Sequence, residues 1–596
     1  MPFGIIDVRT DVPLTGTELL IRHDRPEGIA DGDSNQRQLK RVMHRGIEII
    51  LIPQPSDNDP NDPLVRYSHV PLFDSIKGGN LTGVLQLWPR WKKETAFAVL
   101  FMNNIIFAAV PAPLLAAATY AVSVILNVSI TKVSQLSGYQ LLIVAVIGPL
   151  VSVFAQKYGK RLQFLLAAIA GTLGTVVCII GSQKMSYSTL LAGRMIQGLG
   201  STAWESLSLA AIGDMFYLHE RGFRTALTVA TLTCSTSLVS IIAGVLTERC
   251  GWKAVFIAVL PFNAVGLLGA IFFLPETQYR RSLPAATDGA DASFANPTKS
   301  NGQEVSIIHN EQAQTTKAMV GYWGGLMAWS GTYSDRSILI LLGEIFIHLI
   351  NPAVIWILLV SGVIISLYVG TAYITAQIWT PPPYLLTVSQ NGYFYAGSFI
   401  GGVLATVAGP ICDWMTRLLS RLNGGVFEAE FRIPANIIGI IFSALGWFMF
   451  MWVVDNPRPD GYYLGAFFYG VACVGCSFPA TVASLYILDS FPKDATEIFI
   501  LQMMVKNFMF YAFSTFVNDW VARAGPGRLF QTWGIVACAL IATSIPMCTY
   551  LTFLLHPNVG SIEVMQRLFI NISVADIFGK VNRKFYSKHK ILKSLV

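Results

Sequence analysis

Runs of apolar residues recur along this 596-residue chain, each bounded by a stretch of polar and charged residues. A helix needs about 20 residues to cross the ~30 Å hydrocarbon core of a bilayer, and most of the runs approach or exceed that length. The pattern predicts an all-α integral membrane protein with twelve transmembrane helices in two pseudo-symmetric six-helix halves. The predicted spans are 96–120, 138–154, 162–180, 189–212, 226–246 and 254–274, then 352–375, 393–412, 435–454, 462–488, 498–516 and 532–555.

The polar stretches divide the chain into five predicted regions. The apolar run 337–350 between the halves is too short to cross a bilayer, so we expect a helix that lies in the membrane interface. The C-terminal tail ends in basic residues that suit contact with anionic lipid. The regions are a cytosolic N-terminal tail (1–94), a first transmembrane half (95–275), a cytosolic linker (276–351), a second transmembrane half (352–555) and a basic cytosolic C-terminal tail (556–596).

Lysine and arginine are concentrated in alternate loops. The loops after the second, fourth and eighth spans carry most of them, although Arg523 and Arg528 fall in a loop of the other set. Cytosolic loops of membrane proteins carry an excess of Lys and Arg, so we expect both termini in the cytosol. The Asn-Val-Ser triplet at Asn127 then lies outside and is a predicted glycosylation site, whereas the triplets at Asn80 and Asn571 lie inside.

The composition excludes several classes of protein. Hydrophobic residues make up 53% of the chain and charged residues 13%, about half the charge of a soluble domain. The net charge of +7 is spread beside apolar runs, which argues against a nucleic-acid partner. The sequence contains neither H-E-x-x-H nor G-x-x-x-x-G-K-[ST]. We therefore expect no enzyme activity, no ATP-binding site, no cofactor and no metal, even at the Cys473 and Cys476 pair.

Short signatures recur at matching places in the two halves. The segment 152–161, SVFAQKYGKR, resembles the G-x-x-x-D-[RK]-x-G-[RK]-[RK] signature of the major facilitator superfamily, with Ser152 and Gln156 in place of the Gly and Asp. The second half repeats part of it from Gly409 to Asp413. The fourth span opens with RMIQGLG from Arg194, which matches the family's R-x-x-Q-G-x-G signature. Such internal repeats are typical of transporter folds.

Other segments are similar to fungal twelve-span members related to drug:proton antiporters and to polyamine or cation carriers. They are LWPRWKK at 87–93, DMFYLHERG at 214–222, PET at 275–277 and NGG at 423–425. The antiporter signature of the fifth span lacks its proline at 239–244, which leaves the direction of transport open. The resemblance implies a monomeric plasma-membrane transporter that works by alternating access on a small-molecule substrate, with protons as the coupling ion.

A polar stripe runs along the fourth span, because Arg194, Gln197, Ser201 and Glu205 lie within about 60° on a helical wheel. An unpaired charge at mid-bilayer costs at least ~2.5–3.5 kcal/mol, so the stripe should face the interior. We interpret Glu205 as a proton carrier, since burial favours a neutral carboxyl group; permanent pairing is the alternative. The resemblance implies proton coupling for Arg194, with hydrogen bonding to loop carbonyls as the alternative. Asp413 is the next candidate.

Polar residues of other spans are predicted to line the substrate pathway. Tyr368, Thr375 and Trp379 share one side of the seventh span and suit aromatic or cationic ligands, although aromatic residues also occur at membrane interfaces. Lys506 argues against the attraction of polycations unless a carboxylate neutralises it. The predicted set is Asn103, Asn104, Gln197, Tyr368, Thr375, Trp379, Gln502, Lys506 and Asn507.

The charges of the signature loop have a different predicted role. By resemblance they are gating residues, which latch the two halves at the cytosolic face through helix C-terminal dipoles and acidic partners. This predicted cytosolic gate consists of Lys157, Gly159, Lys160, Arg161 and Asp214.

These observations favour a proton-driven transporter that exports amphipathic organic compounds such as drugs or secondary metabolites. The alternative within the same fold is proton-coupled uptake of a nutrient, an organic cation or a polyamine. A membrane sensor that does not transport is a hypothesis from a different class, which a large folded tail would favour.

Overall fold

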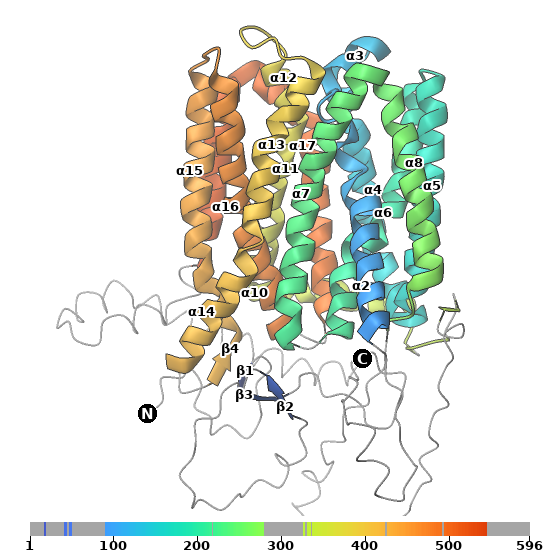
Figure 1. The fold of residues 1–596 in the computed structure, drawn as a ribbon, viewed down its shortest axis with the longest axis vertical. Helices are drawn as coiled ribbons and strands as arrows, with labels where there is room; N and C mark the ends of the chain where they lie inside the picture. The colour runs from blue at the N-terminus through green and yellow to red at the C-terminus, as the bar shows by residue number, and fades with distance from the viewer. Residues whose placement is uncertain are drawn as a thin grey trace, which may run out of the picture.

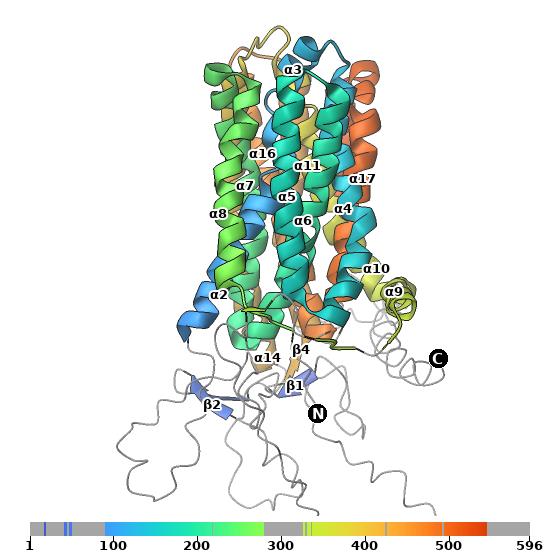
Figure 2. The same ribbon diagram turned by 90° about the vertical axis from the view of Figure 1, so that its right-hand side faces the viewer.

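The helices of the computed structural model run side by side along one axis (Figures 1 and 2). One end of the bundle, which we call the basic end, carries Lys157, Lys160, Arg161 and Arg432; the opposite end carries Asn127. The structure describes residues 17–19, 41–44, 47–50, 90–216, 218–278, 326–327, 331–334, 336–422, 426–491 and 494–544.

The first span of the first half is broken into short pieces. Its pieces are α2 (Arg90–Asn103), the π-helical turn η3 (Asn104–Ala109), the 3₁₀ turn η4 (Ala112–Leu115) and α3 (Thr119–Leu126). Pro111 and Pro113 explain the break, because proline lacks an N–H group and clashes with the preceding helical turn. The other spans are the continuous helices α4 (Ile130–Tyr158), α5 (Lys160–Gln183), α6 (Tyr187–Met215), α7 (Leu218–Cys250) and α8 (Trp252–Phe273).

The second half follows α9 (Ile338–Ile347) and η6 (His348–Ile350), which lie across the bundle axis at the basic end (Figure 2). Its first span is again composite: α10 (Pro352–Ile357), η7 (Leu358–Val363), α11 (Ile364–Gly370), η8 (Thr371–Tyr373) and α12 (Thr375–Trp379). The remaining elements are α13 (Val388–Ala405), α14 (Ala408–Leu422), β4 (Val426–Glu428), η9 (Ala429–Ala435), α15 (Asn436–Asp455), α16 (Gly461–Ser490), α17 (Ala495–Ala524) and α18 (Pro526–Ala542).

Local sequence signals set several helix boundaries. The Ser129 hydroxyl accepts from Lys132 N and so caps α4, and Thr387 forms a capping box with Gln390 at the start of α13. These side chains satisfy N–H groups that the first helical turn leaves without partners. Gly159 separates α4 from α5 with φ of 94°, a conformation that favours glycine.

The two halves repeat the same pattern of helix contacts. In the first half α5 packs on α6 and α8, and α4 packs on α6; in the second half α15 packs on α16 and α18, and α13 packs on α16. Glycines allow the close approaches, since the Cα of Gly171 lies 2.3 Å from an ideal Cβ built at Gly200 and the nitrogen of Ala472 lies 2.4 Å from one at Gly446. The contacts fit the predicted pseudo-symmetry.

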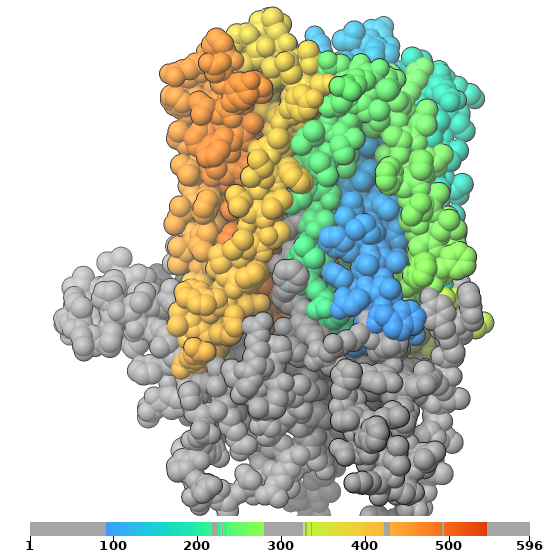
Figure 3. Space-filling model, viewed as in Figure 1, coloured from blue at the N-terminus to red at the C-terminus, as the bar shows by residue number. Residues whose placement is uncertain are grey.

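Two seams join the halves. α4 packs along α17 and α7 packs along α13, and the second of these seams faces the viewer in Figure 3. The α4–α17 seam includes Gly138 against Ser514, and the α7–α13 seam includes Gly244 against Gly392. Each seam pairs a helix of one half with a helix of the other.

The twelve predicted spans coincide with helices or strings of helices in the described part of the chain. Eight of these are long and apolar enough to cross a membrane. The predicted bounds were wrong in places: α4 extends eight residues before 138, and the span predicted at 393–412 is two helices, α13 and α14. The span predicted at 96–120 consists of four short helical pieces, because of the prolines described above. Residues 545–555 of the last predicted span lie outside the described residues.

Short strands lie at the basic end (Figure 1). β1 (Thr17–Leu19) pairs antiparallel with β4, with Thr17 opposite Glu428, and β2 (Arg41–His44) pairs antiparallel with β3 (Ile47–Ile50). These ladders are too short to alter the all-α class. The prediction at 337–350 is matched by α9 and η6, and the five-region division of the chain stays a prediction.

Candidate functional site

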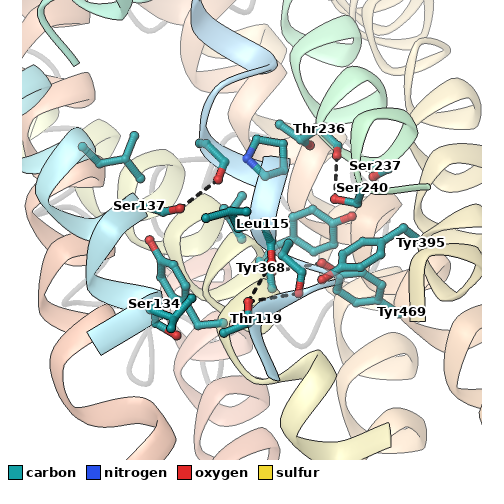
Figure 4. A pocket seen from close by; sticks show the side chains of 18 residues that line it. Leu115, Thr119, Ser134, Ser137, Thr236, Ser237, Ser240, Tyr368, Tyr395 and Tyr469 are labelled. Atoms are coloured by element: carbon teal, nitrogen blue, oxygen red, sulfur yellow. Dashed lines mark hydrogen bonds between the residues drawn. The ribbon is translucent and has the colours of Figure 1, made fainter. Parts of the chain in front are cut away.

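A cavity lies between the halves, and Figure 4 shows the side chains that line it. It is lined by η4, the start of α3, α4 and α7 of the first half, and by α11, η8, α13 and α16 of the second half. The lining residues of α4, α7 and α16 fall in the parts of these helices that are nearer the opposite end. None of the described residues that line it has an ionisable acidic or basic side chain other than tyrosine. Its polar groups are hydroxyls, contributed by Thr119, Ser134, Ser137, Thr236, Ser237, Ser240, Tyr368, Tyr373, Tyr395 and Tyr469.

Tyrosine rings form the wall of the cavity on the second half. The rings of Tyr368 and Tyr469 stack with their centroids 4.9 Å apart, and Tyr395 meets Tyr469 edge to face at 6.1 Å. The Tyr395 hydroxyl is buried and has no hydrogen-bond partner among the described residues. Aromatic faces bind apolar groups and attract organic cations, so the wall suits ligands that combine a ring or a cation with an apolar body.

Hydroxyl groups also join the halves beside this wall. Ser237 of α7 and Ser398 of α13 share a 2.6 Å hydrogen bond, and the Tyr368 hydroxyl bonds to Ser398. All three side chains are buried. A ligand that hydrogen-bonds Tyr368 would therefore compete with a contact between the halves.

Glu205 and Lys506 form an ion pair that crosses from one half to the other. Lys506 Nζ on α17 donates to Glu205 Oε1 on α6, and Asn507 Nδ2 lies 3.3 Å from Glu205 Oε2. The two charged side chains are 11% and 17% exposed. The pair lies about ten residues from the basic-end termini of α6 and α17, about 15 Å along each helix. The structure thus brings together three predicted site residues from distant spans.

Arg194 lies fully buried against the broken first span. Its Nη1 donates to the carbonyl of Pro111, to Gln140 Oε1 at 3.1 Å and to Gln197 Oε1 at 3.3 Å, and its guanidinium lies 5.3 Å from the Phe256 ring centroid. The Pro111 carbonyl belongs to the N-cap residue of η4, so Arg194 fixes the start of that turn. This geometry matches the alternative interpretation of Arg194, in which it binds loop carbonyls.

Several residues predicted to line the pathway lie away from the cavity. Gln197 bonds Thr175 at 2.9 Å within the first half, and Gln502 bonds Ser361 at 2.7 Å within the second. Trp379 is fully buried among Tyr384, Phe394 and Gly465. Asn103, Asn104 and Thr375 are buried as well and, like these three, are absent from the cavity wall. Of the seventh-span residues that we predicted, Tyr368 lines the cavity.

The predicted gate residues make contacts within the first half. Lys160 pairs with Asp214 of α6, and Arg161 donates to the carbonyls of Leu274 and, at 2.8 Å, Ile271 at the end of α8. Lys157 Nζ donates to the Arg336 carbonyl at 3.2 Å. Arg161 thus contacts the carbonyls at the C-terminal end of α8. These particular contacts join parts of one half or the linker, and the gating role of these residues stays a prediction.

Glu276 organises this loop, although sequence reasoning did not select it. Its carboxylate accepts from the backbone N–H groups of Lys160 at 3.0 Å and Arg161 at 3.1 Å, at the start of α5. Burial raises the pKa of the Glu276 carboxyl, and the backbone hydrogen bonds oppose that shift. An ideal Cβ at Gly159 would lie 2.2 Å from Glu276 Oε2, which explains the glycine. The signal was the PET segment at 275–277.

Asp413 lies at the basic end of the second half. It accepts from Arg432 at 2.9 Å, and Arg432 also pairs with the buried Asp489. The Asp413 side chain is 38% exposed, so it sits at the end of the bundle and not at its middle. This position favours an ion-pair role within the second half over a proton-carrying role.

Sequence reasoning also missed most of the cavity wall. Tyr373, Tyr395 and Tyr469 come from three spans, and nothing in one sequence indicates that these spans meet. A weak signal existed in α7, where Thr236 and Ser240 recur four residues apart and therefore share one helix face. That spacing marks a polar stripe without indicating what it faces.

The chain is similar to membrane transporters of fungi. It is 22% identical over 550 residues to an uncharacterised MFS-type transporter of Schizosaccharomyces pombe, covering 85% of this chain and 88% of that one. It is 22% identical over 560 residues to protein HOL1 of Saccharomyces cerevisiae, covering 84% and 89%. The solved proton:xylose symporter XylE shares the fold at a TM-score of 0.51 and 14% identity, over 77% of this chain and 96% of that one. The family model of the Major Facilitator Superfamily matches residues 95–514, and the chain belongs to this superfamily of secondary transporters.

Proposed function

We propose that this transporter exports amphipathic organic compounds, such as drugs, toxins or secondary metabolites, in exchange for protons. The observation that carries the proposal is the cavity between the halves, whose wall combines tyrosine rings with hydroxyl groups and, among the described residues, contains no carboxylate or amine. Ligand sites are mostly apolar with a few polar groups that fix orientation. A compound with an apolar or aromatic body and one or two hydrogen-bonding groups fits this wall.

Proton coupling is assigned to Glu205. Its carboxylate is paired with Lys506 across the halves, so protonation of Glu205 would remove the attraction and free α6 from α17. Breaking a buried ion pair leaves each partner with an uncompensated charge. A protonated Glu205 is neutral, so the carboxyl group does not incur this cost when the pair breaks. Alternating access exposes a mid-bundle site to each side in turn as the halves rock.

Uptake of a nutrient, an organic cation or a polyamine is the alternative. The tyrosine faces suit a single organic cation. A polyamine requires several carboxylates, and Glu205, the acidic residue nearest mid-bundle among the predicted site residues, is already paired with Lys506. The cavity therefore favours monocationic or neutral amphipathic substrates over polycations.

The proposed orientation places the basic end in the cytosol. That end carries Lys157, Lys160 and Arg161, in agreement with the positive-inside rule, and it gives both termini a cytosolic location. We propose a monomer in the plasma membrane, because the cavity is complete within one chain.

Counterflow in proteoliposomes tests the proposal. Proteoliposomes that contain the purified protein would be loaded with candidate aromatic cations, neutral amphipathic compounds or polyamines. Exchange of each compound would be measured with and without a pH gradient. Export predicts that amphipathic compounds exchange and that a gradient drives them toward the acidic side. Uptake would be favoured if only polyamines exchange, or if the substrate moves with the protons and accumulates on the side away from the acidic compartment.

A matched pair of variants links the result to the cavity. Tyr395→Phe removes the buried hydroxyl that lacks a partner, while Tyr463→Phe changes an exposed tyrosine outside the cavity. We expect Tyr395→Phe to change the apparent affinity for at least one substrate class and Tyr463→Phe to leave it unchanged. Equal behaviour of the two variants for every substrate would place the binding site elsewhere.

A further inference from the structure

The helix α9 has an apolar face that the described residues leave exposed. Leu339 is 80% exposed and Ile350 at the end of η6 is 60% exposed, and both lie on the side away from the buried Leu341 and Ile345. Ile340, Phe346 and Ile347 are also exposed. α9 carries one charged side chain, Glu344, which is paired with Arg336. Its remaining side chains are apolar, so the exposed face formed by Leu339, Phe346 and Ile350 suits an apolar partner.

The position of α9 identifies that partner. Only Asn351 separates η6 from α10, the start of a membrane span. Ile355 and Leu359, early in that span, are 42% and 41% exposed and face the lipid side of the bundle. The exposed face of α9 continues this lipid-facing surface. Since the thirteen residues 338–350 extend at most about 20 Å, α9 with η6 lies along the membrane and does not cross it.

The inner side of α9 covers the α4–α17 seam. α9 packs on both α4 and α17, and its buried Leu341 and Ile345 share a core cluster with Val153 of α4 and Ile498 of α17. A tether fixes its N-terminal side to the first half, because Tyr333 N donates to the Lys157 carbonyl at 2.8 Å. Its C-terminal side continues into the second half. α9 therefore bridges the two halves.

We propose that α9 is a lipid-bound brace, seated in the membrane leaflet at the basic end, which holds the α4–α17 seam closed. Beneath it, Gln156 Nε2 of α4 donates to Glu497 Oε1 of α17 at 2.6 Å. When the basic-end parts of α4 and α17 separate, α9 must shift against the lipid. Lipid contact thus opposes opening at this end. The proposal requires no particular substrate or coupling ion, and its leaflet is cytosolic if the proposed orientation holds.

A fluorescence measurement tests the lipid contact. In a background with Cys234, Cys250, Cys538 and Cys548 replaced by serine, an environment-sensitive fluorophore would be attached to one introduced cysteine at a time. The positions are Leu339→Cys, Ile355→Cys as the lipid-facing reference, and Thr332→Cys in the exposed tether as the aqueous reference. Phosphatidylcholine with a nitroxide on its acyl chain should quench the fluorophore at Leu339→Cys as strongly as it quenches the fluorophore at Ile355→Cys. Weak quenching at Leu339→Cys, equal to that at Thr332→Cys, would show that water, another protein or a second copy covers this face, and would overturn the proposal.

A cross-linking measurement tests the brace. In the double variant Gln156→Cys/Glu497→Cys, the rate of disulfide formation reports how often the seam is closed. Leu339→Glu, whose charge the lipid rejects, should lower this rate several-fold, while Thr332→Glu should not change it. Leu339→Gln, a polar but uncharged variant, gives a second measurement of the same rate. Both Leu339 variants should fold, because the Leu339 side chain makes little contact with the protein. An unchanged rate in both Leu339 variants would rule out a bracing role even if the lipid contact exists.

Discussion

Lys506 on α17 is paired with Glu205 on α6, and the two residues are 301 positions apart in the chain. Each is a charge that would be unfavourable alone inside a membrane protein, and each neutralises the other across the boundary between the halves. The pair links a proton-titratable group to the relative position of two helices.

The first prediction concerns coupling. Glu205→Gln keeps the size of the side chain but fixes its neutral state, so it should abolish accumulation driven by a pH gradient while exchange continues. One proton per cycle gives about tenfold accumulation for each pH unit, and this factor should fall to about one. Proteoliposome flux with and without a gradient measures it. Glu497→Gln is the matched control, and full coupling in Glu205→Gln would make Glu205 structural.

The second prediction concerns the stability of the pair. Lys506→Met leaves a buried carboxylate without its partner, which should destabilise the protein by about 3–5 kcal/mol. The double variant Glu205→Gln/Lys506→Met removes both charges and should recover much of that loss. Thermal unfolding in detergent compares the single and double variants. Additive losses in the double variant would show that the two residues act independently.

The third prediction concerns Arg194. Arg194→Ala removes the donor to the Pro111 carbonyl and should loosen η4, whose residues line the cavity. We expect a weaker apparent substrate affinity and lower thermal stability, with the response to a pH gradient retained. Arg194→Lys, which offers a donor without the planar fork, should recover part of the affinity. Loss of gradient response with normal affinity would instead support the proton-coupling interpretation.

The fourth prediction concerns topology. Asn127 is exposed at the opposite end, in a left-handed conformation between α3 and α4. If that end is extracellular, Asn127 should carry any glycan, and Asn127→Gln should abolish the mobility shift produced by a glycosidase in a fungal host. A glycan at Asn571 would contradict the proposed location of the C-terminus.

Periodicity and length predicted the architecture, because a bilayer demands long apolar helices whatever the packing between them. The sequence also marked Glu205, Lys506 and Asn507 as buried polar groups that needed partners. It did not show that they partner one another, since that depends on which spans meet. Trp379 shows a second limit: its place on one side of the seventh span suggested a ligand wall, whereas in the structure it is buried against Phe394 and is not among the residues that line the cavity.

The glycines of the two seams have a mechanical consequence. Toward the opposite end the seams pack closely at glycine: an ideal Cβ at Gly244 would lie 3.0 Å from the Cα of Gly392, and one at Gly138 would overlap the Ser514 side chain. Toward the basic end the halves meet through the long side chains of Gln156 and Glu497. Long side chains can disengage and re-form contacts one at a time, whereas a close glycine contact lacks this freedom. If the halves rock as proposed, we expect the smaller displacement toward the opposite end and the larger one where α9 crosses the seam.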